Sequence, residues 1–419
     1  MEIVKRRELA KMVFQTRIKS EIGKLKVVLL KRPGKEIENI TPATMHELLF
    51  DDIPYLSEAQ REHDKFAEVL RQNKVKVLYL DDLLAETLKN KAIKNTFLKD
   101  LITCSGFTRG ATYDALKDYL GNLETQNMVS KIMEGVRKEV FGKTLKNLRS
   151  FPEIDNTPFI MAPMPNLYFT RDLASIIGKG ASISSMTFKA RQRETLFIEY
   201  ILKSHPLFSN QTIPYWHRRD DITKIEGGDV LVLNNHVVAV GISERTSVEA
   251  IENLASNLFK NDSGYDTVIA IKIPNNHAMM HLDTVFTMVN YDQFTVYPDI
   301  MQEHRKMDIW TLHPSSEGIE YKKHSDLQQV LKDCLGLDEI DLIYTGKGDP
   351  VAAMREQWND GSNTLTIAPG EVVTYNRNYV SNELLREHGI KVHEIPSSEL
   401  SRGRGGPRCM SMPLLRADL

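Results

Sequence analysis

Five short segments of the chain contain residue types that can do chemistry. Three of them directly precede β-branched apolar runs, and the last is a glycine-rich stretch that ends in a cysteine. Alone, each segment is a weak signal, because glycines usually mark turns and a lone cysteine is usually an inert small hydrophobe. The segments are Met164–Asp172 (MPNLYFTRD), Ile225–Asp229 (IEGGD), Gly241–Thr246 (GISERT), Met280–Thr284 (MHLDT) and Gly403–Cys409 (GRGGPRC).

Together, these segments fit a reaction at a guanidinium group. A guanidinium is planar and cationic, so its binding calls for two or more carboxylates in a fixed geometry. Its carbon is a poor electrophile, which favours attack by a thiolate. Release of ammonia calls for a proton donor that titrates near neutral pH, such as histidine. The chain supplies all of these groups, together with arginines that could hold a substrate carboxylate. The residues are Cys409, His281, Asp172, Glu226, Asp283, Arg191, Arg245 and Arg404.

A zinc site is the main alternative use of the same residues. His281, Asp283 and Glu226 offer metal ligands, but no second histidine follows His281 at i+4 and the chain has no Cys-x-x-Cys pair. We therefore expect no metal and no organic cofactor.

Composition argues against two classes of partner. The 54 basic and 56 acidic side chains give a net charge of −2, so no basic field would attract nucleic acid. The longest apolar runs, such as Val27–Leu30 and Val237–Ile242, are far shorter than the ~20 residues that a membrane span needs. We expect neither a nucleic-acid nor a membrane partner.

The N-terminus and the cysteines indicate a cytoplasmic protein. The first residues (MEIVKRRELAKMVFQ) are charged throughout and lack the apolar stretch of a secretory signal. Three scattered cysteines, Cys104, Cys334 and Cys409, are too few for a disulfide framework.

The hydrophobic pattern predicts an α/β chain with a helical interruption. Lys24–Leu30 reads as a strand, Glu58–Asn73 as a helix and Lys74–Leu80 as a strand. From Asp81 to Leu148 apolar residues recur at helical spacing without a convincing strand, and Ser150–Pro158 reads as an exit linker. We therefore predict three parts: residues 1–80, of which 1–15 form an N-terminal extension; a helical domain at 81–155; and residues 156–419 carrying the active site.

The last part repeats short strands with helices between them. This rhythm favours a repeated small α/β unit over one open parallel sheet. Predicted helices are Arg191–Lys203, Ser247–Leu258 and Leu327–Leu335. Predicted strands are Ala174–Ile177, Val230–Leu233, Val237–Val240, Val268–Ile273, Val285–Val289, Asp341–Tyr344, Thr364–Ala368 and Val372–Tyr375.

With these residues in view, the chain closely resembles the arginine deiminase family of the guanidino-group modifying superfamily. The resemblance runs from Ser20 to the terminal CMSMP, in the family's order and spacing. Its markers are LKVVLLKRPGKEIENITP, LLFDDIPY, EHDKFAEVLR, MPNLYFTRD, IEGGDVLVL, GISERTS, HLDTVFTMV and GRGGPRC.

The resemblance implies a fold and an activity. The fold would be a five-bladed pseudo-symmetric α/β propeller of ββαβ units, with an inserted all-helical domain and a central active site. The activity would be hydrolysis of free L-arginine to L-citrulline and ammonia through a cysteine-linked S-alkylthiouronium intermediate, the first step of arginine catabolism by the deiminase pathway. A cytoplasmic homodimer or higher homo-oligomer is implied as well.

The resemblance also assigns roles to residues. Cys409 would be the nucleophile and His281 the general acid and base, while Asp172 and Asp283 would grip the guanidinium. Glu226 would orient His281 and contact the guanidinium side. The α-carboxylate would be held by Arg191, Arg245 and Arg404, and the remainder of the pocket would be shaped by Asn166, Phe169, Asp229 and Gly403. Arg408 departs from some relatives, which have histidine before the cysteine, and this puts the pH dependence in question.

Two other functions remain open at this point. A sister hydrolase would act on agmatine or a methylated arginine, but agmatine lacks the carboxylate that the three arginines would bind. A binding or adhesion protein with the same fold would not need the complete set of cysteine, histidine and acids.

Overall fold

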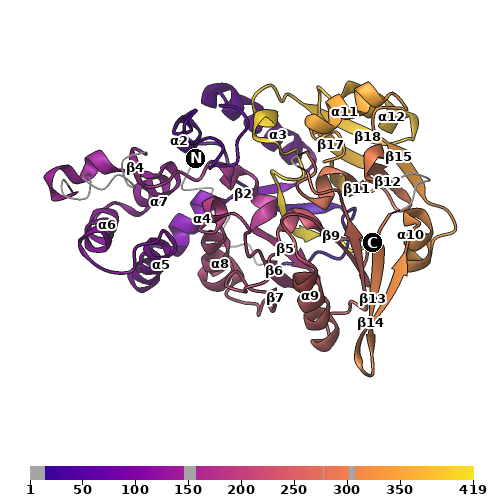
Figure 1. The fold of residues 1–419 in the computed structure, drawn as a ribbon, viewed down its shortest axis with the longest axis horizontal. Coiled ribbons are helices and arrows are strands. Elements are labelled where there is room, and N and C mark those ends of the chain that lie inside the picture. The colour runs from indigo at the N-terminus through magenta and orange to yellow at the C-terminus, as the bar shows by residue number, and fades with distance from the viewer. Residues whose placement is uncertain (1–14, 146–156, 277, 302–306) are drawn as a thin grey trace.

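The computed structural model describes residues 15–145, 157–276, 278–301 and 307–419 (Figure 1). The predicted N-terminal extension, apart from its last residue, lies outside these ranges, and so do residues 150–156 of the predicted linker. Among the described residues, no helix is both long and apolar enough to cross a membrane.

Mixed three-stranded units are the repeated element of the fold. Five sheets of the described chain share one pattern, in which a first strand pairs antiparallel with a second, and the second pairs parallel with a third. The units are β19 (Met412–Arg416), β1 (Leu25–Leu30) and β2 (Lys76–Tyr79); β5 (Ala174–Ile177), β6 (Gly180–Ile183) and β7 (Tyr215–His217); β8 (Val230–Val232), β9 (Val237–Ile242) and β10 (Thr267–Lys272); β11 (Phe286–Met288), β12 (Gln293–Val296) and β15 (Asp341–Tyr344); and β16 (Leu365–Ala368), β17 (Glu371–Tyr375) and β18 (Lys391–Ile395).

A helix connects the second strand of each unit to its parallel third strand, as a parallel pair requires. These helices are α3 (Leu56–Gln72), α8 (Thr195–Ser204), α9 (Val248–Lys260), α10 (Leu327–Leu335) and α12 (Tyr379–Glu387). The strands and helices expected from the apolar runs are thereby confirmed, with one correction. The helix predicted to begin at Arg191 begins at Thr195, because Lys189–Arg191 forms a 3-10 turn.

The first and second strands of the units are largely buried on both faces, which explains their continuous apolar sequences. In β1, five of six residues are buried. The amphipathic helix α3 buries Phe66 and Leu70 in the same hydrophobic cluster as Leu25, Val28 and Leu30 of that strand. The helices therefore cover sheets whose strands carry little polar surface.

Four consecutive helices within the described ranges follow β2 and extend away from the sheets on the left of Figure 1. They are α4 (Leu80–Thr87), α5 (Lys91–Cys104), α6 (Ala111–Gly121) and α7 (Thr125–Glu134). Asn90 and Glu124 cap α5 and α7 by accepting hydrogen bonds from backbone N–H groups. The short strand β3 (Val136–Arg137) then pairs with β4 (Phe159–Met161), a pairing that the sequence pattern did not predict.

Two additions complete the chain. A hairpin of β13 (Ile309–Ser315) and β14 (Gly318–His324) extends the β8–β10 sheet at its β10 edge. Helices α2 (Lys35–Glu38) and α11 (Pro350–Trp358) lie in connections between strands.

The first strand of each unit begins next to a turn that carries polar side chains. Three of these are 3-10 turns, Thr170–Leu173 before β5, Gly227–Asp229 before β8 and Leu282–Thr284 before β11. The glycine-rich stretch before β19 carries Cys409 in the same way. Residues that are far apart in sequence therefore occupy equivalent positions in their units.

Candidate active site

A narrow cavity lies where these turns meet. Its volume is about 20 Å³, which is room for about one water molecule. It brings together most of the residues that the sequence analysis singled out. The lining consists of Leu49, Asn166, Phe169, Asp172, Arg191, Arg245, Met280, His281, Thr284, Gly403, Arg404 and Cys409.

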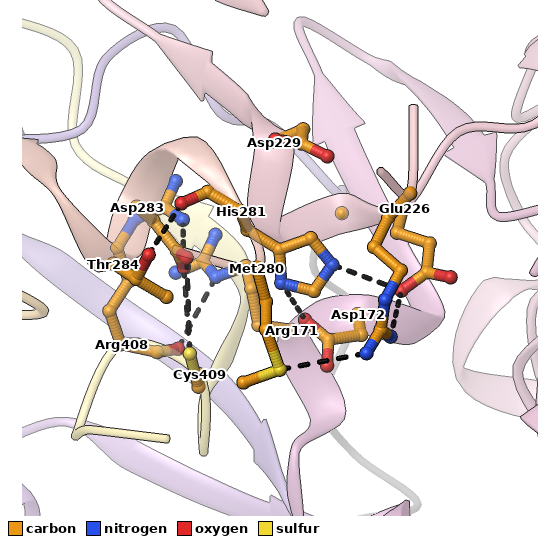
Figure 2. Close-up of polar contacts among 12 residues, drawn as sticks. Arg171, Asp172, Glu226, Asp229, Met280, His281, Asp283, Thr284, Arg408 and Cys409 are labelled. Carbon is orange, nitrogen blue, oxygen red and sulfur yellow. Dashed lines mark hydrogen bonds and ion pairs between the residues drawn. The ribbon is translucent and has the colours of Figure 1, made fainter. Parts of the chain in front are cut away.

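Both backbone polar groups of Cys409, its N–H and its carbonyl, form hydrogen bonds. Its N–H donates to Oδ1 of Asn363 at 3.0 Å, and its carbonyl accepts from the N–H of Arg171 at 3.0 Å. Its Sγ lies 3.7 and 3.9 Å from the two carboxylate oxygens of Asp283 (Figure 2). The thiol is thus fixed and faces an acid.

The environment opposes ionisation of this thiol. Burial raises the pKa of Cys409 well above its usual value, and the negative charges of Asp283 and Asp172 raise it further. Arg408 lowers the pKa of Cys409 but does not outweigh them. A positive charge next to these two acids would therefore favour the thiolate.

His281 lies between two other acids. Figure 2 shows its ring with Nε2 directed at Glu226, 3.0 Å from Oε2, and with Nδ1 3.7 Å from Oδ1 of Asp172. Burial lowers the pKa of His281, but the charge of Asp172, the hydrogen bond with Glu226 and the charge of Asp229 together raise it to about 9. The imidazole is therefore protonated at neutral pH and can donate a proton.

Glu226 is the ionised partner of that imidazolium. Burial raises the pKa of Glu226, but Arg245, His281 and Arg191 lower it to about 2. Its side chain is buried and does not line the cavity. This arrangement fits the predicted orienting role toward His281.

Asp229 does not line the cavity, although the resemblance implied that it would shape the pocket. Its carboxylate accepts hydrogen bonds from the hydroxyls of Ser243 and Thr246 and from the N–H of Leu282, at 2.6 to 2.8 Å. It therefore ties the turn after His281 to the loop that carries Arg245. Its contribution to the site is positional.

Two of the three predicted carboxylate-binding arginines are paired with acids of the site. Nη1 of Arg191 lies 2.5 Å from Oδ2 of Asp172, and its Nε lies 2.9 Å from Oε2 of Glu194. Nη1 of Arg245 lies 3.3 Å from Oε2 of Glu226, and its guanidinium stacks on the ring of Phe188. These pairings were not foreseen from the sequence.

Arg404 lines this cavity and also a larger neighbouring pocket. Its guanidinium stacks 3.6 Å from the centre of the Trp358 ring, and its Nη1 lies 3.3 Å from Oδ2 of Asp51. Within the described chain, the buried Nε atoms of Arg404 and Arg245 have no hydrogen-bond acceptor. Both arginines thus retain a donor for a further anionic group.

The remaining predicted pocket residues form the wall. Asn166 donates from Nδ2 to the carbonyl of Leu48, and Phe169 packs on Tyr168 with ring centres 4.0 Å apart. At Gly403 a methyl group would lie 1.8 Å from the hydroxyl oxygen of Tyr168, so only glycine fits this close approach. The wall is therefore preformed by packing.

Asp283 and Arg408 form a pair that the sequence did not reveal. Nη1 of Arg408 lies 2.7 Å from Oδ2 of Asp283, and its Nε lies 3.1 Å from Oε2 of Glu21. Burial raises the pKa of Asp283, and Arg408 opposes this effect. Asp283 is not among the residues that line the cavity, but its carboxylate lies 3.7 Å from Sγ of Cys409, which does line it.

Asn363 is a site residue that sequence reasoning missed. Besides accepting from Cys409, it donates from Nδ2 to the carbonyl of Asp283 at 2.9 Å, so one amide fixes both residues. Its position in the chain could have indicated this role, because Asn363 precedes the first strand of its unit, β16, as Asp172 precedes β5. No group of three or more histidines, cysteines and acids among the described residues is arranged to hold a metal ion.

Solved structures define the class of the fold. The amidinotransferase SxtG of Microseira wollei matches with a TM-score of 0.55 at 14% identity, over 96% of this chain and 98% of that one. A dimethylarginine dimethylaminohydrolase of Pseudomonas aeruginosa matches with a TM-score of 0.52 at 12% identity, over 93% and 99%. The chain therefore has the α/β fold of these enzymes, with its mixed sheets.

Sequence comparison identifies the family. The family model for arginine deiminase matches residues 46–416. The arginine deiminase of Lentilactobacillus hilgardii is 61% identical over 96% of both chains, and that of Levilactobacillus brevis is 60% identical over 96% of this chain and 98% of its own. This chain belongs to the arginine deiminase family.

Proposed function

We propose that this chain hydrolyses free L-arginine to L-citrulline and ammonia, as the names of its relatives at about 60% identity describe. It is thus a hydrolase of the C–N bonds of linear amidines. The observation that carries the proposal is the position of Cys409, whose Sγ lies 3.7 Å from the carboxylate of Asp283 and which lines one cavity with His281 and three arginines.

The substrate would lie with its guanidinium between Asp172 and Asp283 and its α-carboxylate toward the arginines. The unpartnered Nε atoms of Arg245 and Arg404 support this direction. Arginine is larger than the cavity of about 20 Å³, so lining side chains must move as it enters. Asp172 would exchange its pairing with Arg191 for one with the substrate, which would free Arg191 for the carboxylate.

Substrate binding would prepare the nucleophile. The charges of Asp283 and Asp172 raise the pKa of the thiol, so a guanidinium placed between them would cancel part of that effect. The cation thereby promotes formation of the thiolate that attacks it.

The first half-reaction forms a bond between Sγ of Cys409 and the guanidinium carbon. The C–N bond of the tetrahedral adduct then breaks, its electron pair leaves with nitrogen, and His281 supplies the proton that makes ammonia a competent leaving group. An S-alkylthiouronium remains attached to Cys409, and His281 is now neutral. Glu226 stabilises the charged imidazole before this transfer.

The second half-reaction uses the neutral His281 as a base. It removes a proton from water, whose oxygen attacks the thiouronium carbon. The C–S bond then breaks with its electron pair leaving on sulfur, which returns the thiolate, and the O-protonated product loses its hydroxyl proton to solvent as citrulline. The two aspartates hold the reacting cation in both halves and supply orientation. The cycle consumes one water and no cofactor.

Several finer features belong to the same proposal. The five ββαβ units, each with its first strand beginning at the site, support a five-bladed pseudo-symmetric propeller. The consecutive helices α4–α7 support division into residues 1–80, an inserted helical domain at 81–155 and residues 156–419. A cytoplasmic homo-oligomer stays a prediction.

Cysteine substitutions test the proposal directly. Cys409→Ser should lose citrulline production by roughly 10³-fold or more while keeping its fold. Cys104→Ser and Cys334→Ser are matched controls, because these cysteines lie outside the cavity, and they should keep most activity. Purified protein is assayed colorimetrically for citrulline, with circular dichroism as the check on folding.

Three outcomes would contradict the proposal. Equal losses in all three cysteine variants would show that Cys409 has no special role. Turnover of agmatine in place of arginine would indicate a sister hydrolase and remove the carboxylate role of the arginines. Loss of activity in a chelator, with recovery on adding zinc, would replace the thiol mechanism by a metal-dependent one.

A further inference from the structure

A cluster of buried arginines lies next to the Cys409 turn and does not line the proposed active-site cavity. Arg171, Arg408 and Arg416 are 5%, 1% and 1% exposed. The carboxylates that interact with them are those of Glu21 and Asp283, both paired with Arg408. Three guanidinium groups therefore face two carboxylates, and one positive charge is not balanced within the cluster.

A second, enclosed cavity lies at this cluster. Its volume is about 10 Å³, and it shares no lining residue with the proposed active site. That volume accommodates about one water-sized sphere, which excludes oxyanions and carboxylates. The lining consists of Ile18, Glu21, Arg171, Ala174, Ser175, Ile176, Val230, Val232, Met412, Pro413 and Arg416.

Two arginine nitrogens at this cavity lack an acceptor. Arg171 uses Nε for the carbonyl of Arg408 at 3.4 Å, and Arg416 uses Nη1 for the carbonyl of Gly23 at 2.8 Å. In the part of the chain that the structure describes, the buried Nη2 of each has no hydrogen-bond partner. A buried, charged donor without an acceptor is costly, so both atoms call for one.

Glu21 does not fill this need. Its Oε1 accepts from the N–H of Val232 at 3.2 Å, and its Oε2 pairs with Arg408. Burial, and next the charge of Arg408, lower the pKa of Arg171 to about 9, while burial lowers the pKa of Arg416 to about 10. The surroundings therefore favour a negative charge close to these two side chains.

We propose that this cavity binds a chloride ion between Nη2 of Arg171 and Nη2 of Arg416. A chloride ion is larger than a water molecule, so the lining side chains must move outward slightly to admit it; it then accepts from both donors and balances the surplus charge. A water molecule fits without such movement and also accepts, but it brings no charge. The site has a structural consequence, because Arg171 also contacts the carbonyls of Arg408 and Cys409 through its Nε and N–H. Chloride should stabilise the turn that carries the nucleophile.

Bromide diffraction tests the occupant in the unaltered protein. Crystals grown with sodium bromide in place of chloride should show an anomalous peak between the two Nη2 atoms. Density at that position without an anomalous signal would identify water and overturn the proposal. This measurement needs no variant, so it decides even where a substitution prevents folding.

Thermal unfolding tests the same site in solution. In sodium chloride, compared with sodium gluconate at equal ionic strength, the wild-type Tm should rise saturably by roughly 2–4 °C. Arg416→Gln should lose this increment. Arg193→Gln is the matched control, because Arg193 is also buried but does not line the cavity, and it should keep the increment. An equal chloride increment in wild type and Arg416→Gln would overturn the proposal.

Discussion

At the scale of single residues, the charge of Cys409 is decided by neighbours that sequence proximity does not reveal. Arg408 is adjacent in sequence, yet its guanidinium bridges Asp283 and Glu21. Its positive charge lowers the pKa of Cys409, and the same guanidinium pairs with Asp283, the acid 3.7 Å from Sγ. The expected link between Arg408 and the pH dependence therefore involves Asp283 as well as the thiol.

Replacing Arg408 by histidine should move the alkaline limb of activity. Arginine remains cationic across the working range, whereas a histidine of unperturbed pKa ~6.5 loses its charge as the pH rises. In Arg408→His, the positive charge that lowers the pKa of Cys409 would then be lost, so the pKa of this thiol would rise further. The wild type should stay active to neutral pH or above, and the kcat/KM profile of the variant should fall at lower pH.

A surface pair provides the control for this change. Arg32 is partly exposed and pairs with Asp64, away from the cavity, so Arg32→His should leave the profile unchanged. Superimposable profiles for wild type and Arg408→His would instead mean that the substrate cation and the acid–base pair alone set the thiolate population.

The residue types of the site could be predicted from sequence, but their partners could not. A thiol, a histidine and several acids follow from the chemistry of a guanidinium, and they meet as expected around the cavity. The pairing of Arg191 with Asp172 depends on three-dimensional contacts between different elements. The contact of Asn363 with Cys409 was not predicted, because an isolated amide side chain has no distinctive spacing in the sequence.

At the scale of elements, the site depends on how closely the 3-10 turns approach one another. The turn Gly227–Asp229 packs against the turn after His281, and a methyl group at Gly228 would lie 2.5 Å from Nδ1 of His281. At Gly227 a methyl group would lie 2.1 Å from the carbonyl oxygen of Arg171. The glycine pair is therefore required by packing, in addition to any turn that it forms.

Gly228→Ala should consequently impair turnover more than folding. The added methyl group must displace the His281 ring, which disturbs its contacts with Glu226 and Asp172. We expect kcat to fall by roughly 10²-fold, the scale associated with a misplacement of about 1 Å. Steady-state citrulline kinetics measure the effect, and circular dichroism monitors the fold.

Gly121→Ala serves as the matched control. A methyl group there meets no atom within 4 Å, and the residue ends a helix far from the site, so kinetics should be unchanged. Wild-type kcat in Gly228→Ala would show that the ring tolerates displacement and would contradict the positional role of this turn.

Among the strands, those that are buried are easier to predict from sequence than those that are exposed. The buried strand β5 has a continuous run of small and β-branched residues, and its predicted bounds match the structure. The hairpin strand β14 (GIEYKKH) is mostly exposed and paired on one side, so its sequence carries no burial pattern to detect. Strand prediction succeeded where burial selects the residues.

At the scale of the whole molecule, five site segments that span more than two hundred residues of sequence are fixed by one assembly of sheets. The helical segment is part of that assembly, because it shares a hydrophobic cluster with α8 and β5. Members of this cluster include Leu84, Phe97, Leu116, Ile132, Ile198 and Ile176. The geometry at Cys409 therefore depends on the stability of the complete chain. The titration of buried site groups must in turn change the free energy of unfolding with pH.

The raised pKa of His281 determines the direction in which the free energy of unfolding changes with pH. Its folded pKa of about 9 exceeds the unfolded value of 6.5, so its contribution to the free energy of unfolding is complete below pH 6.5 and is lost as the pH rises through 9. The stability difference between wild type and His281→Gln should therefore be largest at pH 6 and shrink toward pH 9.5, measured by urea unfolding. For His63, burial lowers the pKa to about 3, so both states are neutral above pH ~7 and the difference for His63→Gln should stay constant from there to pH 9.5. A His281→Gln difference that is constant or grows with pH would show that the folded protein does not hold this imidazole in its charged form.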